Sequence, residues 1–145
     1  MEKVLCVCVG NISRSPMMQA VLQAQLGDAF VVESAGLTKE LAGRPANHRS
    51  VACMRERCID LSSHKSRFIG DLDLPHYRWI VCVGHEEAAR VRAALGAHTA
   101  HVIVANGAAG GILDPYELGM EGYRECLALL DRVMPDIARE IAASR

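Results

Sequence analysis

The chain has 145 residues, of which 50% are hydrophobic and 23% are charged, so it is long enough for one globular domain and too apolar to be disordered. The formal net charge is -1, and the scattered lysines and arginines give no electrostatic reason to expect nucleic acid or an anionic membrane as a partner. No apolar stretch has the length of a membrane span or the pattern of a signal peptide. We therefore expect a cytoplasmic protein with a single domain over residues 1–145.

The chain contains six cysteines, which we expect to be reduced thiols because no export signal accompanies them. No C-x-x-C or H-x-x-x-H spacing is present, so the sequence predicts no metal site. Apart from Cys8, the cysteines fall on apolar faces and are expected in the core: Cys6, Cys53, Cys58, Cys82 and Cys126.

Strand-like and helical patterns alternate along the chain, which predicts an α/β fold with a parallel sheet and helices on both faces. Strands are expected at residues 3–8, 30–34, 79–83 and 101–105, and the first is a nearly continuous apolar run of the kind buried on both faces.

The first helix is expected to begin with Ser15 as N-cap and Pro16 in its first position, and to stop at Gly27. Further helical patterns cover residues 45–58, 86–95 and 123–141, and a loop of small residues is expected at 106–111. Pro135 lacks a backbone donor, so a kink or a break is expected in the last helix.

The most informative segment is the motif Cys-x5-Arg-Ser, which runs from Cys8 to Ser15. It joins the first strand to the first helix, so the loop lies at the carboxyl edge of the sheet, where open α/β folds bind ligands. The N–H groups of such a tight loop converge on an anion, and the helix dipole adds to this attraction. We therefore expect a phosphate-binding loop that contains Val9, Gly10, Asn11, Ile12, Ser13 and Ser15.

Three side chains are suited to phosphate chemistry. Arg14 carries a planar fork of donors that can bind two phosphate oxygens at once. The same positive surroundings favour the thiolate form of Cys8, which is the nucleophilic form. Asp114, followed by Pro115 and Tyr116, offers a carboxylic acid that can protonate a leaving group. The predicted roles are nucleophile for Cys8, phosphate clamp for Arg14 and general acid for Asp114.

Residues 8–16, 33–36, 61–64 and 114–116 together resemble the low-molecular-weight protein tyrosine phosphatases. The resemblance implies a four-stranded parallel sheet with flanking helices and a two-step hydrolysis that needs no metal or other cofactor. It implies that Asp114 then acts as base for the attacking water. It also implies a phosphotyrosine-containing protein as substrate, a tyrosine kinase as a candidate partner, and a hydrogen-bond network that supports the loop through Asn11, Ser15, Ser34 and His64.

The chain departs from the usual family pattern at two positions. Ser13 stands where members often carry a second cysteine, and Glu117 stands where a second aromatic residue often follows the Asp-Pro pair. The expected aromatic wall of the substrate pocket therefore depends on Tyr116 alone, opposite the apolar side chain of Ile12.

Three other functions stay open. A phosphoarginine phosphatase of the same fold would carry threonine in place of Ile12, whose branched apolar side chain suits a phenyl ring better. An arsenate reductase of the same fold would need further redox cysteines, and Pro16 stands where those reductases usually have glutamine. A catalytically inactive phosphate-binding module would not need Cys8, Arg14 and Asp114 together.

Overall fold

Four parallel strands form the centre of the computed structural model, which describes residues 1–98 and 100–144. The strands are β1 (Glu2–Cys8), β2 (Phe30–Gly36), β3 (Trp79–Cys82) and β4 (His101–Val104), in the spatial order β2-β1-β3-β4. β1 pairs with β2 on one side and with β3 on the other, so the direction of strand order changes at β1. Such a switch point opens a crevice at the carboxyl ends of the strands. The four-stranded parallel sheet is confirmed.

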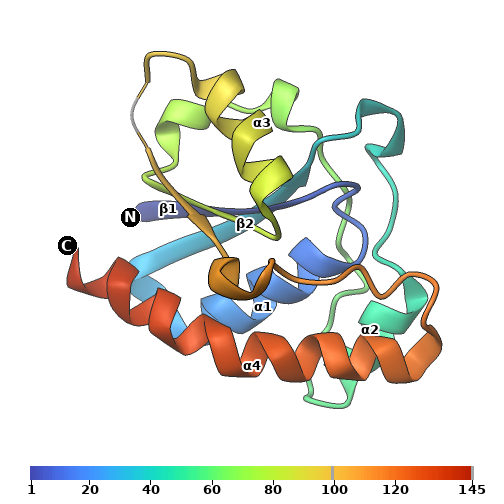
Figure 1. Ribbon diagram of the computed structural model, residues 1–145. Coiled ribbons are helices and arrows are strands. Elements are labelled where there is room, and N and C mark those ends of the chain that lie inside the picture. The colour runs from blue at the N-terminus through green and yellow to red at the C-terminus, as the bar shows by residue number, and fades with distance from the viewer. Residues whose placement is uncertain (99, 145) are drawn as a thin grey trace.

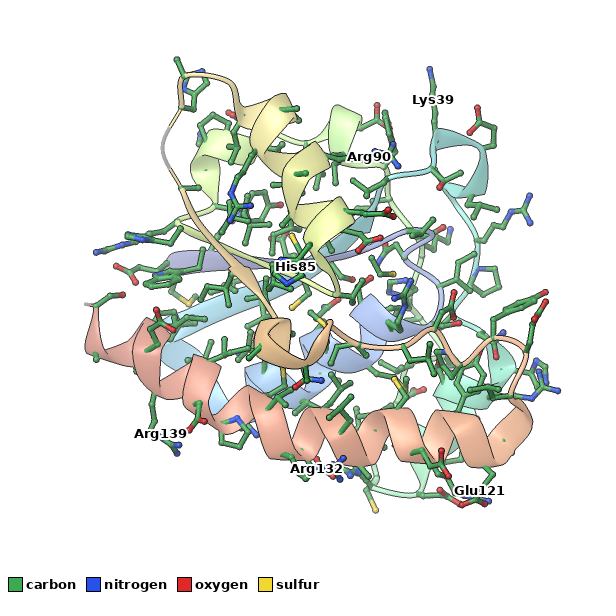
Figure 2. All side chains as sticks on the ribbon, in the orientation of Figure 1. Lys39, His85, Arg90, Glu121, Arg132 and Arg139 are labelled. Carbon is green, nitrogen blue, oxygen red and sulfur yellow. The ribbon has the colours of Figure 1, made fainter. Side chains whose placement is uncertain are left out.

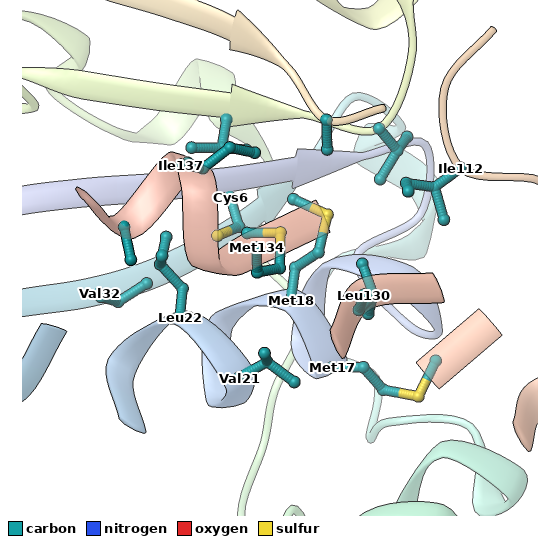
Figure 3. Packing of buried hydrophobic residues seen from close by; sticks show 14 of the residues in the cluster. Cys6, Met17, Met18, Val21, Leu22, Val32, Ile112, Leu130, Met134 and Ile137 are labelled. Carbon is teal, nitrogen blue, oxygen red and sulfur yellow. The ribbon is translucent and has the colours of Figure 1, made fainter. Parts of the chain in front are cut away.

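Helices cover both faces of this sheet (Figure 1). α1 (Arg14–Leu26), α2 (His48–Arg55) and α4 (Gly119–Ala143) contribute to the core on one face, and α3 (His85–Leu95) covers the other. Successive side chains of β1 alternate between the two cores, because side chains of a strand point to opposite faces. Cys6 faces α1 and α4, where it lies close to Met18 and Met134 (Figure 3), whereas Leu5 and Val7 face α3.

The expected start of the first helix is wrong. α1 begins at Arg14 with Ser13 in the N-cap position, so Ser15 and Pro16 lie inside its first turn. The Ser15 hydroxyl is not available as a cap because it lies 3.0 Å from Cys8 Sγ and accepts a hydrogen bond from Asn11 Nδ2. Ser15 is a residue type typical of N-caps, but here its hydroxyl makes hydrogen bonds within the loop between β1 and α1.

The second helix is shorter than expected. Asn47 caps α2 by accepting a hydrogen bond from the Arg49 N–H at 2.8 Å, and the helix ends at Arg55. Cys58 follows in a left-handed conformation with φ 61° and is exposed, so its expected place in the core is wrong.

α4 continues without a break through Pro135, so a break at that position is wrong. Figure 1 shows the axis of α4 changing direction toward its C-terminal end. Met134 and Ile141 are fully buried on either side of the proline, and their packing against the sheet holds the helix together despite the missing donor. Among the described residues, no helix combines the length and the apolar character that crossing a membrane requires.

Candidate active site

The loop that follows β1 is held at the carboxyl edge of the sheet by the end of β2. Leu37 N–H and Thr38 N–H both donate to the Val9 carbonyl, at 2.8 and 3.1 Å. Gly36 lies so close that a Cβ atom there would come within 2.9 Å of backbone atoms of Val9, Gly10 and Asn11. Only glycine permits this approach, so the end of β2 fixes one side of the loop.

Asn11 turns the loop through a left-handed conformation, with φ 59°, and is fully buried. Its Oδ1 accepts from Arg67 N–H at 2.9 Å, and its Nδ2 donates to Ser15 Oγ at 2.8 Å. Asn11 N–H points at Cys8 Sγ, 3.2 Å away. The turn that asparagine tolerates therefore directs a backbone donor at the sulfur.

Cys8 lies at the base of the loop, with only 3% of its surface exposed. Its Sγ is contacted by the Ser15 hydroxyl at 3.0 Å as well as by Asn11 N–H. The sulfur therefore lies at the start of α1, within hydrogen-bond distance of a backbone N–H and a hydroxyl.

Arg14 and Asp114 meet above Cys8. Arg14 is 8% exposed, and its Nη1 donates to the Ile112 carbonyl at 2.8 Å, which orients the guanidinium. The Asp114 carboxylate lies 3.7 Å from Arg14 Nη2 on a half-exposed side chain. Its other oxygen accepts from Tyr116 N–H at 3.1 Å, so the turn that contains Pro115 holds the carboxylate in place.

A cavity of about 290 Å³ brings the predicted residues together. Its lining consists of Cys8, Val9, Gly10, Ile12, Ser13, Arg14, Leu41, Arg44, Asp114 and Tyr116. Cys8 lies at its base, while Tyr116, with 62% of its surface exposed, lies at its mouth. A larger groove of about 540 Å³ lies between α1 and residues 59–64, but none of the three predicted catalytic residues lines it.

His64 lies against the loop, as its predicted supporting role requires. Its Nε2 is 2.8 Å from the Asn11 carbonyl. Burial lowers the pKa of His64, and the nearby charge of Arg67 acts in the same direction, whereas the hydrogen bond to Asn11 opposes them. A neutral ring with its proton on Nε2 donates to the carbonyl and so fixes the backbone of the loop.

Ser34 makes a different contact from the one expected. Its hydroxyl donates to Gln19 Oε1 at 2.6 Å and so connects β2 to α1. Arg67 makes the contact between this side of the sheet and the Asn11 side chain. Its N–H binds Asn11, and its guanidinium binds the Ser34 carbonyl and Glu33.

Several residues of the site have no signal in the sequence. Tyr123 is fully buried on α4, and its hydroxyl lies 3.0 Å from Ser13 Oγ, although the two residues are 110 positions apart. Burial raises the pKa of Tyr123, so its hydroxyl stays protonated. The helical period of α4 indicates only that Tyr123 faces the core. Leu41 and Arg44, which line the cavity, lie in a segment without a recognisable motif.

The remaining cysteines of the core are buried thiols. Burial raises the pKa of Cys82 and of Cys126 to about 12, and it raises those of Cys6 and Cys53 as well. These groups are protonated at neutral pH and are therefore poor nucleophiles.

Comparisons with known proteins identify the family of the chain. The family model for "Low molecular weight phosphotyrosine protein phosphatase" matches residues 3–145. The probable low molecular weight protein-tyrosine-phosphatase EpsP of Ralstonia solanacearum is 31% identical over 132 residues, which are 90% of each chain. The low molecular weight phosphotyrosine protein phosphatase of Sus scrofa is 33% identical over 87 residues, which are 57% of this chain and 54% of that protein.

Solved structures share the fold over nearly the whole length. Wzb of Vibrio vulnificus, in complex with benzylphosphonate, has a TM-score of 0.85 and 28% identity, covering 96% of this chain and 98% of that one. YwlE of Bacillus subtilis has a TM-score of 0.84 at 22% identity, covering 98% and 99%, and shows the fold alone. The match over almost all of the sequence, together with the loop at the end of β1, places this chain in the low molecular weight phosphotyrosine protein phosphatase family.

Proposed function

We propose that this chain is a protein tyrosine phosphatase that works through a cysteinyl-phosphate intermediate. The observation that carries the proposal is that one cavity is lined by a buried thiol at its base, an oriented guanidinium and a carboxylate near its mouth. These are the three groups that phosphoryl transfer to sulfur requires.

In the first step the Cys8 thiolate attacks phosphorus, the new S–P bond forms, and the P–O bond to the leaving group breaks. Arg14 and the backbone N–H groups of the loop bind the other phosphate oxygens, whose negative charge they stabilise in the transition state. The Asp114 carboxylic acid gives its proton to the leaving oxygen. Asp114 is placed for this because it lines the same cavity as Cys8 and its side chain is half-exposed, near the mouth.

In the second step the Asp114 carboxylate takes a proton from water, and the water oxygen attacks phosphorus. The S–P bond breaks, inorganic phosphate leaves, and the Cys8 thiolate is restored. Both steps use groups of the chain itself, and neither calls for a metal ion.

Depth and lining favour phosphotyrosine as the substrate. The nucleophile is almost fully buried whereas Tyr116 at the mouth is exposed, so the phosphorylated side chain must be long enough to reach the base. Ile12 and Tyr116 give the cavity apolar and aromatic walls that fit a phenyl ring. The relative EpsP is named a probable protein-tyrosine-phosphatase, and Wzb was solved with benzylphosphonate, which supports the same class of substrate. The substrate would be a phosphotyrosine protein of the cytoplasm, with a tyrosine kinase as counterpart.

The alternative function, a phosphoarginine phosphatase, is distinguished by the residue at position 12. A structural neighbour, YwlE, is described as an arginine phosphatase, but at 21% identity it supports the fold only. Ile12 is the residue at which the two activities are expected to diverge, because a threonine hydroxyl offers a polar partner to a phosphoguanidinium.

The test is kcat/KM on matched peptides that carry phosphotyrosine, phosphoserine or phosphoarginine, measured with a chelator present. We expect phosphotyrosine to be preferred, and Ile12→Thr to shift the preference toward phosphoarginine. Cys8→Ser should abolish turnover, and Asp114→Asn should slow poor leaving groups far more than good ones. A wild-type preference for phosphoarginine, or activity that survives Cys8→Ser, would overturn the proposal.

A further inference from the structure

The mouth of the catalytic cavity carries a cation that the chemistry does not use. Arg44 lines the cavity together with Leu41, and its side chain is exposed. Within the part of the chain that the structure describes, its guanidinium has no hydrogen bond and no ion pair. An unpaired guanidinium at a binding site is available to a carboxylate of the ligand.

The backbone that carries Arg44 is held firmly although it lies on the surface. Ser66, with only 3% of its surface exposed, accepts from Arg44 N–H through its hydroxyl at 2.9 Å and donates its own N–H to the Arg44 carbonyl at 2.8 Å. The Ser66 carbonyl also accepts from Gly43 N–H at 2.8 Å, and its hydroxyl donates to the Leu41 carbonyl. These hydrogen bonds to Ser66 fix the backbone of Arg44, so its guanidinium stays near the mouth of the cavity.

A neighbouring hollow carries the opposite charge. Asp114 and Tyr116 also line a second hollow of about 400 Å³, whose other lining residues are Leu113, Glu117 and Leu118. The two hollows therefore adjoin at Asp114 and Tyr116. Arg44 lines the first hollow and Glu117, with two leucines, lines the second, so a peptide that extends over both meets the two charges at different places.

We propose that Arg44 binds a carboxylate of the substrate beside the phosphotyrosine, so that the enzyme selects sites with an acidic residue on one flank only. On the other flank, Glu117 repels acidic residues, and apolar residues fit the leucines. This inference rests on the proposed function, because it requires that a phosphotyrosine peptide occupy the cavity.

The test uses three phosphotyrosine peptides of one backbone: one with glutamine on both flanks, one with glutamate on the N-terminal flank, and one with glutamate on the C-terminal flank. We expect one acidic peptide to exceed the neutral peptide about three- to fivefold in kcat/KM, mainly through KM, because exposed ion pairs are weak. The other acidic peptide should not exceed the neutral one. The advantage should shrink as salt is added.

Variants identify the cation responsible. Arg44→Gln should reduce the ratio of acidic to neutral peptide to about one, and Arg44→Glu should take it below one. Arg132→Gln removes the same charge from an exposed position on α4 (Figure 2) that lines neither hollow, and should leave the ratio unchanged. Equal rates on all three peptides, or a ratio that survives Arg44→Gln, would overturn the inference alone. If none of the three peptides is hydrolysed, the proposed function is overturned.

Discussion

Ser13 is held from two sides, by two different helices. Its hydroxyl lies 3.0 Å from the Tyr123 hydroxyl on α4, and its carbonyl accepts from the Ser50 hydroxyl on α2 at 3.2 Å. Ser13 directly precedes Arg14, so these bonds position the residue from which the guanidinium extends. We interpret Tyr123 as a positioning residue that acts through Ser13.

If this interpretation is right, Tyr123→Phe and Ser13→Ala should each lower kcat about three- to tenfold with little change in KM. The double variant should be no slower than either single one, because both substitutions remove the same hydrogen bond. A thermal scan of each variant separates positioning from loss of stability, which should be about 1 kcal/mol. If the losses in kcat of the two single variants multiply in the double variant, Tyr123 acts independently of Ser13.

The absence of a second thiol in the loop has a consequence for oxidation. Peroxide converts an accessible thiolate to sulfenic acid, which a neighbouring thiolate can trap as a disulfide before further oxidation. Ser13 cannot do this, and burial raises the pKa of Cys126, a nearby thiol, to about 12. We expect peroxide to take Cys8 to the sulfinic acid, whereas Ser13→Cys should form a disulfide with Cys8 and recover with reductant. Mass spectrometry of the loop peptide measures both products, and a Cys8 disulfide in the wild type would contradict the expectation.

Among the structural elements, the end of β2 lies in close contact with the backbone of the loop. A Cβ at Gly36 would meet backbone atoms, which cannot rotate away as a flexible side chain can. Gly36→Ala should therefore destabilise the protein by about 1–3 kcal/mol and also lower kcat/KM, because the loop must shift. Gly27→Ala is the matched control: it introduces strain at φ 74° in open space and should cost stability without affecting the rate. Both are measured by urea unfolding and steady-state kinetics.

The segment that carries His64 makes stability depend on pH. The folded pKa of His64 lies below its ordinary value of 6.5, chiefly through burial, so the unfolded chain binds the proton more readily than the folded one. The contribution of neutral His64 is therefore complete above pH 6.5 and is lost as pH falls through the folded pKa. Urea unfolding at pH 7.5 and 5.5 should show a smaller loss of stability for His64→Gln than for the wild type. Equal losses in both proteins would rule His64 out as the titrating group.

β1 and β3 were predictable because they are short apolar runs, fully or almost fully buried in the parallel sheet. The ends of helices were less predictable. Ser15 has the chemistry of an N-cap, but its hydroxyl is used by Cys8 and Asn11, and this contact depends on the fold of the loop. Pro135 breaks an isolated helix, whereas here the packing of Met134 and Ile141 outweighs the lost hydrogen bond.

Binding of the product, inorganic phosphate, should increase the stability of the whole protein. Ligands that bind only the folded state stabilise it by mass action, by about 1.4 kcal/mol at ten times Kd. We expect inorganic phosphate at that concentration to raise Tm by about 3–6 °C relative to chloride of equal ionic strength. Cys8→Ser should keep this shift, and Arg14→Lys, which retains charge but not the planar fork, should lose most of it. A shift that persists in Arg14→Lys would place the anion elsewhere.

The grouping of the three proposed catalytic residues was predictable because they lie in short sequence motifs. Cys8, Arg14 and Asp114 belong to motifs of adjacent residues, and the cavity contains all three. Packing of distant segments brings Tyr123, Ile112 and Arg44 to the site. Such contacts cannot be predicted from a single sequence. Ser34 was expected at the loop because it stands in a matching segment, yet its hydroxyl is directed to Gln19.

The hydrogen bond between Arg14 and the Ile112 carbonyl joins residues 98 positions apart, and this separation orders events during synthesis. A ribosome that adds about 5–20 residues per second makes Arg14 roughly 5–20 s before its partner. Tyr123 on α4 follows later still. Throughout this interval the nascent chain carries Cys8 without the hydrogen bond that orients Arg14 and without Asp114. We therefore expect dephosphorylation to begin only after α4 has left the ribosome and docked, so a nascent chain is inactive however early its first strand and loop emerge.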